Sequence, residues 1–142
     1  MGQGRLPEAI GHFERALLLR PNYAEAHNGL AIALFGLGKV PEAIGHFEQA
    51  VLLRPDYAEA QYNLGVALRE QGKLPEAIGH FEQAVRLKPD DAEAQSDLGA
   101  ALEKMGKIDD AIAHYEESLK LRPDFAAARS ALARLQAGQT GR

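Results

Sequence analysis

The residues of this sequence whose type and spacing best suit chemistry are four histidines that recur at equal intervals. They are His12, His46, His80 and His114, each 34 residues after the one before. A row of histidines could bind metal, but adjacent packed helices lie roughly 8–10 Å apart, whereas histidine nitrogens bind zinc at about 2.0–2.1 Å. Neighbouring histidines therefore cannot readily share one ion, and we interpret them as a duplicated, partly exposed helix position. His27 stands apart from this series and is interpreted as a packing residue.

Two glycine–lysine segments superficially resemble phosphate-binding loops. In both Gly36 to Lys39 and Gly72-Lys73, the lysine is not followed by Ser or Thr, and neither segment follows a predicted strand, as a P-loop requires. The sequence contains no cysteine, so it offers no thiolate nucleophile or disulfide framework. No serine–histidine–aspartate arrangement stands out. We therefore predict that the protein is not an enzyme and uses no cofactor or metal.

Composition and charge narrow the classes of partner. The 142 residues carry a formal net charge of −4, with both signs interspersed, whereas a nucleic-acid-binding protein normally presents a basic face. No segment approaches the roughly 18 apolar residues of a membrane span, and nothing near Met1 is typical of a signal peptide. These features predict a soluble, cytoplasmic protein with no nucleic-acid or membrane partner.

The chain repeats itself every 34 residues. The string Pro-Glu-Ala-Ile-Gly-His-Phe-Glu starts at Pro7, Pro41 and Pro75, and a diverged copy starts at Asp109. The same step separates two further sets of residues: Pro21, Pro55, Pro89 and Pro123, and Gly4, Gly38, Gly72 and Gly106. A period of this length indicates a stack of supersecondary units, so the repeats must be identified before any other feature.

Each period predicts two helices, here called the first-type and the second-type helix. The first-type helix from Ala58 to Gln71 places four apolar residues on one face, namely Ala60, Leu64, Ala67 and Leu68. Gly72 tolerates the positive φ that often follows a helix end. The second-type helix begins near Pro75 and ends before Pro89. Its apolar stripe is predicted to be Ala77, Ile78, Phe81, Ala84, Val85 and Leu87.

With Ala58 as the first position, the repeat resembles the tetratricopeptide pattern. The matching residues are Leu64, Gly65, Gly72, Ala77, Phe81, Ala84 and Pro89. The next repeat matches at Leu98, Gly99, Gly106, Ala111, Tyr115 and Pro123, with Ser118 in place of alanine; the preceding one matches at Leu30, Gly38, Ala43, Phe47, Ala50 and Pro55. The resemblance implies an all-α fold, an α-solenoid of antiparallel helix pairs (a TPR superhelix) with about eight helices. The small positions are expected to let helices approach closely, with the aromatic residue filling the wedge between them.

We expect residues 1–142 to form a single array. Residues 1–23 supply a half repeat with only a second-type helix, and three repeats follow at residues 24–57, 58–91 and 92–125. Residues 126–142 are predicted to be a lone first-type or capping helix, ending near Ala137, with a frayed tail from Gly138. Gly11, Gly45 and Gly79 fall inside second-type helices, where close packing or recent duplication could account for them.

In the family that the chain resembles, first-type helices line a groove that receives peptides or protein segments. The corresponding residues here are Glu25, Asn28, Gly29, Ile32, Phe35, Glu59, Tyr62, Asn63, Val66, Arg69, Glu93, Ser96, Asp97, Ala100 and Glu103, with Ser130, Ala131 and Arg134 from the last helix. The lysines of chaperone-binding members are missing. The array is similar in flavour to those of O-linked N-acetylglucosamine transferases, but only Asn63 represents their asparagine ladder.

The leading prediction is a protein-interaction scaffold that binds a protein or peptide segment with apolar anchors and neutral or basic character. The groove glutamates have an alternative explanation as solvated residues that suit helix dipoles. A second prediction is weak head-to-tail self-association through Ile10, Phe13, Leu17 and Leu132. Burial would contribute roughly 1.5–3 kcal/mol for each side chain, against an association cost of about 4–15 kcal/mol. A third is an accessory domain of a larger enzyme.

Overall fold

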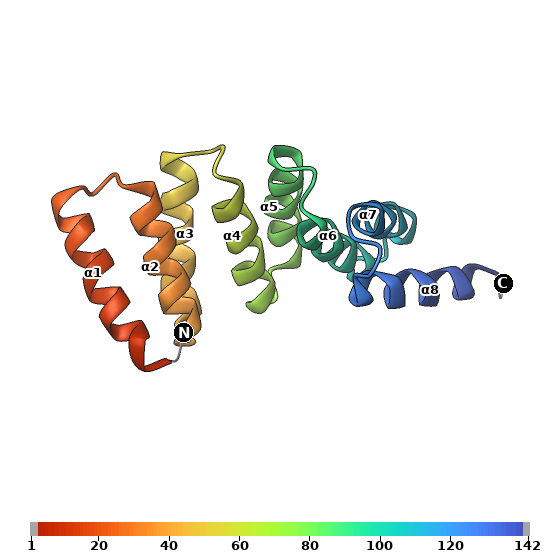
Figure 1. Cartoon of the computed structure of the whole chain (residues 1–142), viewed down its shortest axis with the longest axis horizontal. Helices are drawn as coiled ribbons and strands as arrows, with labels where there is room; N and C mark the ends of the chain where they lie inside the picture. The colour runs from red at the N-terminus through yellow and green to blue at the C-terminus, as the bar shows by residue number, and fades with distance from the viewer. Residues whose placement is uncertain (1–2, 141–142) are drawn as a thin grey trace. The chain divides into compact units, whose positions relative to one another are not determined.

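The computed structural model describes residues 3–140, and all regular structure in that range is helical (Figure 1). A 3₁₀ turn, η1 (Gln3–Arg5), precedes eight α-helices. These are α1 (Leu6–Leu19), α2 (Ala24–Gly36), α3 (Val40–Leu53), α4 (Ala58–Glu70), α5 (Leu74–Leu87), α6 (Ala92–Lys104), α7 (Ile108–Leu121) and α8 (Ala126–Thr140). The predicted fold class, an all-α solenoid of about eight helices, is confirmed. In this part of the chain, no helix is long and apolar enough to cross a membrane.

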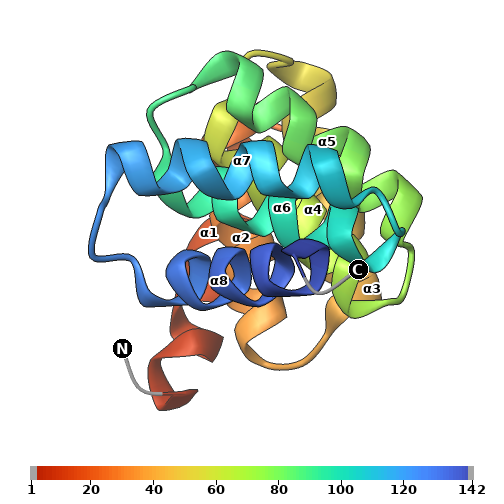
Figure 2. The same ribbon diagram turned by 90° about the vertical axis from the view of Figure 1, so that its right-hand side faces the viewer.

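The chain divides into two compact units, Met1–His80 and Phe81–Arg142, and the α5 segment extends across the division. In the first unit, α2 packs on both α1 and α3, and α3 also packs on α4. In the second unit, α7 packs on both α6 and α8; Figure 2 shows α7 and α8 side by side. The even-numbered helices are first-type and the odd-numbered helices are second-type.

The three glycines that follow first-type helices have the left-handed backbone that the sequence predicts. Gly38, Gly72 and Gly106 have φ angles of 80°, 77° and 80°. At the end of α2, the Lys39 amide donates to the Leu34 carbonyl at 2.9 Å, and the Gly38 amide donates to the Phe35 carbonyl at the same distance. Glycine adopts this conformation without a steric penalty, so it can end the helix and turn the chain into the next one.

The predicted apolar faces form the core, with one exception. Leu64 and Phe81 are 1% and 0% exposed, and the alanines of both stripes are also buried. Leu87 is 37% exposed, so its assignment to the stripe is wrong; it is the last residue of α5 and lies beyond the turns that pack. At Gly99, an added Cβ would lie 3.1 Å from the Tyr115 ring and 3.2 Å from the Ala111 carbonyl oxygen. A small residue is therefore required there for α6 and α7 to approach.

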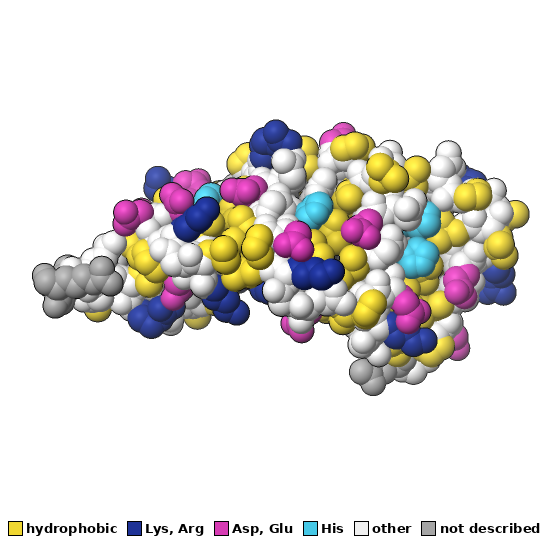
Figure 3. All heavy atoms as spheres, turned by 180° about the vertical axis from the view of Figure 1, so that it is seen from behind, with side chains coloured by type: hydrophobic (Ala, Val, Ile, Leu, Met, Phe, Trp, Pro, Cys, Tyr) yellow, Lys and Arg dark blue, Asp and Glu magenta, His cyan; other side chains and the backbone are white. Residues whose placement is uncertain are grey.

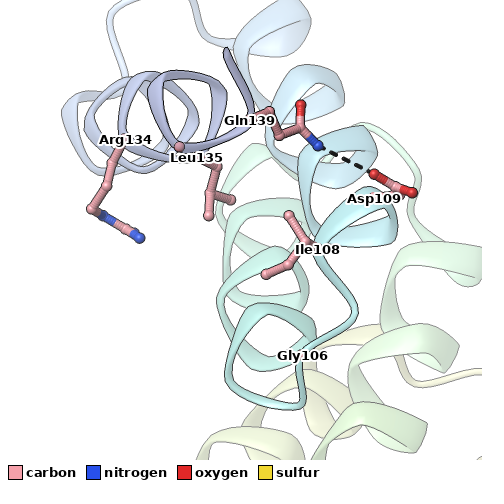
Figure 4. A pocket seen from close by; sticks show the side chains of 7 residues that line it. Gly106, Ile108, Asp109, Arg134, Leu135 and Gln139 are labelled. Carbon is pink, nitrogen blue, oxygen red and sulfur yellow. Dashed lines mark hydrogen bonds between the residues drawn. The ribbon is translucent and has the colours of Figure 1, made fainter. Parts of the chain in front are cut away.

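The C-terminal helix is longer than the sequence predicts. α8 continues through Gly138 to Thr140, so the expected frayed tail is wrong for these residues, while residues 141–142 lie outside the described part of the chain. The Gln139 side-chain amide donates to the Asp109 carboxylate at 3.3 Å (Figure 4). This bond spans a cavity of about 330 Å³ whose lining includes Ile108 and Leu135. The contact with α7 holds the end of α8 in place.

The mid-helix glycines are not explained by close packing. A Cβ added at Gly11, Gly45 or Gly79 would meet no atom within 4 Å. Ala113 occupies the same repeat position in α7 and is exposed. Glycine inside a helix costs roughly 1 kcal/mol relative to alanine, and nothing in the structure compensates for that cost at these three positions.

Candidate functional site

An apolar cavity of about 180 Å³ lies on the first unit, where α2, α3 and α4 meet. Its lining residues are Ile32 and Phe35 from α2, Phe47 from α3, and Tyr62, Asn63 and Val66 from α4. Five of these six are predicted groove residues, and the sixth, Phe47, is the predicted wedge aromatic. The structure therefore brings together the central part of the predicted groove.

Local helix geometry explains why these residues converge. Residues three or four apart lie on the same face of a helix, which places Ile32 beside Phe35 on α2, and Tyr62 beside Val66 on α4. Phe47 is only 2% exposed, so its ring is held by the surrounding core. Ile32 is 45% exposed and gives the cavity an accessible apolar rim. The cavity thus combines a fixed floor with open edges, as expected for a preformed binding site.

A chain of hydrogen bonds fixes the polar edge of the cavity. The Asn63 side-chain amide donates to the Asn28 Oδ1 at 3.2 Å, and the Asn28 amide donates to the Tyr57 hydroxyl at 3.3 Å. Burial, and then the charge of Glu59, raise the pKa of Tyr57. Asn28 is 3% exposed, so it positions Asn63 from below and does not itself face a partner. The groove pattern identifies Asn28 but not this supporting role.

The acidic character predicted for the groove is partly neutralised within the first unit. Arg54 Nη1 donates to the Glu25 carboxylate at 3.1 Å, and both side chains are about half-exposed. The Arg54 guanidinium also lies 4.3 Å from the centroid of the Tyr57 ring. Glu59 is exposed. Sequence reasoning missed Arg54 because the partners are 29 residues apart and belong to different repeat positions.

In the second unit, internal partners bind the predicted groove residue Glu103. Its carboxylate accepts hydrogen bonds from the Tyr115 hydroxyl at 3.0 Å and from Arg134 Nη1 and Nη2 at 2.5 and 3.1 Å. The hydrogen bond from Arg134 is the main cause that lowers the pKa of Glu103. Burial, followed by the hydrogen bond to Glu103, raises the pKa of Tyr115. We call these three residues the Glu103 cluster.

The remaining predicted groove residues differ in exposure. Ser96 is buried at 6%, Arg69 and Asp97 are half-buried, and Glu93 is exposed. Gly29 is in contact with the ring of Phe13, because a Cβ built on Gly29 would lie 2.3 Å from Phe13 Cζ. A partner that approaches α2 at this end would therefore meet the phenyl ring before it reached Gly29.

The recurrent histidines take part in a repeated hydrogen-bond chain. Three of them bond, through Nδ1, to a residue of the first-type helix in the same repeat: His46 to His27 at 3.0 Å, His80 to Gln61 at 2.8 Å and His114 to Gln95 at 2.8 Å. Each partner then donates to a proline carbonyl six residues earlier, on Pro21, Pro55 and Pro89 respectively. Burial is the main cause that lowers the pKa of the three histidines. The 34-residue spacing of the partners was the available sequence signal.

No metal cluster accompanies this chain within residues 3–140, because no three His, Cys, Asp or Glu side chains there are placed to hold an ion. Figure 3 shows histidine side chains that reach the surface on one face. His12, on the exposed side of α1, instead accepts a hydrogen bond at Nδ1 from Arg15 at 3.2 Å. The structure thus gives the histidine series a role in joining the two helices of a repeat.

Comparison with known proteins identifies the repeat independently. Two family models described as tetratricopeptide repeat match the chain, one at residues 1–51 and 30–92 and the other at residues 68–135. No curated protein matches the sequence significantly. Among solved structures, MamA is 28% identical with a TM-score of 0.90, over 96% of this chain and 80% of MamA.

Two further solved structures are similar. The first TPR of Spaghetti (RPAP3), bound to the HSP90 peptide SRMEEVD, is 25% identical with a TM-score of 0.78, over 82% of this chain and 93% of that one. YrrB, described as a TPR protein with an unusual peptide-binding site, is 24% identical with a TM-score of 0.86, over 98% of this chain and 72% of YrrB. The YrrB likeness supports the fold alone.

Proposed function

Because the chain belongs to the tetratricopeptide repeat family, we propose that it is a protein-interaction scaffold that binds a protein or peptide segment at the cavity formed by α2, α3 and α4. The observation that carries this proposal is the convergence of Ile32, Phe35 and Val66 on a cavity with a buried aromatic floor. The RPAP3 array, which is 25% identical, was solved with a peptide bound. The proposed role is recognition without catalysis.

The size and lining of the cavity suggest a partner with one large apolar anchor. A cavity of about 150 Å³ can hold a benzene-sized molecule, and the present one measures about 180 Å³. One leucine or aromatic side chain therefore matches the space. Asn63 at the edge has hydrogen-bonding groups beyond the one donated to Asn28. These groups suit the main chain of a segment that passes across the cavity.

The charges favour a neutral segment over an acidic tail. Glu25 is paired with Arg54, and Glu59 is exposed beside them, so the first unit offers no concentrated positive charge at the cavity. The positions that hold clamp lysines in chaperone-binding relatives are here Asn28, Gly29, Tyr62, Asn63, Ser96 and Asp97. We therefore propose a different class of segment from the acidic peptide seen with RPAP3.

A peptide library displayed on phage and selected on the full chain would test the proposal. We expect the selected peptides to share a leucine or aromatic anchor. Ile32→Glu should weaken their binding by at least about tenfold, equivalent to about 1.4 kcal/mol, because it charges the apolar rim. The matched control is Leu52→Glu, which alters an exposed apolar residue of α3 that is outside the cavity. Equal loss in both variants, or in neither, would reject the cavity as the binding site.

Self-association is a second candidate, supported by the exposure of α1. None of its residues is buried, and Ile10, Phe13 and Leu17 are half-buried. At the equivalent positions of α3, Ile44 and Phe47 are buried between two first-type helices. In head-to-tail association, α8 of a second copy would supply the missing helix and would also cover its own half-buried Leu132.

Light scattering across a range of concentrations would test this second candidate. The informative variant is Ala133→Glu, since Ala133 is exposed at the small position through which α8 would receive an aromatic residue. A mass that rises with concentration in the natural chain, but not in the variant, would support association. A monomer at every concentration in both proteins would eliminate it.

A further inference from the structure

The histidine-to-partner hydrogen bond of the first complete repeat differs chemically from the other two. In α4 and α6 the partner is glutamine, whose Oε1 accepts from the histidine. In α2 the partner is itself a histidine, so His27 and His46 face each other through their Nδ1 atoms at 3.0 Å. The two rings are also stacked, with centroids 5.3 Å apart. This pair can therefore respond to protons in a way that the glutamine pairs cannot.

The hydrogen-bond geometry assigns the hydrogens of the neutral pair. The Pro21 carbonyl can only accept, so His27 Nε2, which lies 2.9 Å from it, must carry a hydrogen. Neutral imidazole has a single N–H, and His27 Nδ1 is therefore an acceptor. His46 Nδ1 must then carry the hydrogen of the 3.0 Å bond and donate it to His27.

Protonation changes this bond in two distinct steps. One added proton is tolerated, because a charged His27 can donate to both the Pro21 carbonyl and a neutral His46. A second proton places N–H groups on both facing Nδ1 atoms, so the bond is lost and two positive charges repel each other. In the glutamine pairs, a charged His80 or His114 still donates from Nδ1 to the amide oxygen. Only the His27–His46 pair is broken by protonation.

The groups around the pair set the direction of its pH dependence. His27 is 9% exposed, and His46 is half-buried with Glu14 of α1 and Glu42 of α3 nearby. Burial, and then His27, lower the pKa of His46 below its ordinary value, while the two glutamates act in the opposite direction. Because the unfolded chain then binds more protons, this contribution to stability is present above about pH 6.5 and is lost as the pH falls.

The pair lies directly beside the proposed binding cavity. His27 precedes Asn28, which holds Asn63 at the cavity edge, and His46 precedes Phe47, the cavity floor. We propose that His27 and His46 form a proton-operated latch between α2 and α3, which holds the cavity together until both imidazoles are charged. The consequence for partner binding rests on the proposed function of the cavity, whereas the latch itself does not.

Nitrogen-15 NMR of the imidazoles in the partner-free chain tests the latch directly. At pH 8 we expect His27 to carry its hydrogen on Nε2 and His46 on Nδ1. Between pH 8 and pH 5 the pair should titrate in two coupled steps, and the ring signals of Phe47 should shift with the second step. A hydrogen on His27 Nδ1 at pH 8, or two independent single-proton titrations, would overturn the proposal.

Two substitutions provide matched tests. His27→Gln converts the pair to the type found in the other repeats, so the two-proton step and the associated Phe47 shift should disappear. Gln61→His creates a second pair with His80, and a second coupled titration should appear. If Gln61→His prevents folding, His27→Gln still decides the matter. A coupled titration that persists in His27→Gln would refute the latch, whatever the outcome of the peptide selection at neutral pH.

Discussion

The cavity of the first unit and the Glu103 cluster of the second unit occupy equivalent positions, two periods of 34 residues apart. The corresponding residues are Ile32 and Ala100, Phe35 and Glu103, Phe47 and Tyr115, Tyr62 and Ser130, Asn63 and Ala131, and Val66 and Arg134. In the first unit the side chains leave an apolar space of about 180 Å³. In the second, Tyr115 and Arg134 both bind Glu103.

This comparison separates what builds the repeat from what equips it for binding. The buried aromatic is present in both units, at 2% exposure for Phe47 and 3% for Tyr115, because the wedge between helices must be filled. The positions above it have no such constraint and differ in every pair. A cavity requires that these side chains do not satisfy one another, as Glu103 and Arg134 do in the second unit.

The largest expected effect comes from removal of the aromatic floor. Phe47→Ala should destabilise the protein by about 3–5 kcal/mol, because it deletes a fully packed ring and leaves a void. Tyr115→Phe should cost far less, because the ring remains and Arg134 still binds Glu103. Urea unfolding of both variants would measure the difference. Similar losses would show that the hydroxyl, and not the ring, dominates the second unit.

An intermediate effect of opposite sign is expected at the mid-helix glycines, which distinguish α1, α3 and α5 from α7. Gly45→Ala should stabilise the chain by about 0.5–1 kcal/mol, because a new methyl group meets no atom within 4 Å and alanine favours the helix. The reciprocal change, Ala113→Gly, should destabilise α7 by a similar amount. Thermal unfolding would report both. A destabilising Gly45→Ala would reveal a packing role absent from the structure.

The sequence predicts the solenoid well because the period repeats the core as well as the turns. Leu64 and Phe81 recur with the same apolar spacing in each repeat, and Gly72 recurs at each turn, so one repeat supports the prediction of the next. Most of the lining of the cavity could also be predicted, since the resemblance marks the exposed face of the first-type helices. Phe47 was assigned only to the core, although its ring also forms the cavity floor.

Pairs of side chains from different repeat positions could not be predicted in this way. Glu103 and Arg134 are 31 residues apart, and Glu25 and Arg54 are 29 apart, so the 34-residue register gives no sign that they meet. His27 was interpreted as a packing residue, yet its bond to His46 depends on which ring nitrogen faces α3. Rotamers and hydrogen positions determine these contacts, and they are not encoded in a pattern of residue types.

The smallest expected effect concerns the Glu103 cluster and would make the second unit more like the first. Arg134→Leu removes the main group that lowers the pKa of Glu103. A carboxylate with a lowered folded pKa stabilises the protein above its unfolded pKa of about 4.3, and this contribution is lost as the pH falls through the folded pKa. The variant should therefore be slightly less stable than the natural chain at pH 7. The effect should be small, because Arg134 is 59% exposed and water screens the pair.

The pH dependence of this difference distinguishes charge from packing. Urea midpoints of the natural chain and Arg134→Leu should converge at a pH well below the folded pKa of Glu103, where the carboxyl is protonated in both proteins. Added salt at pH 7 should also reduce the gap. A gap that persisted in acid would mean that the aliphatic part of Arg134 supports α8 by packing. The contrast between the two units would then arise from shape and not from charge.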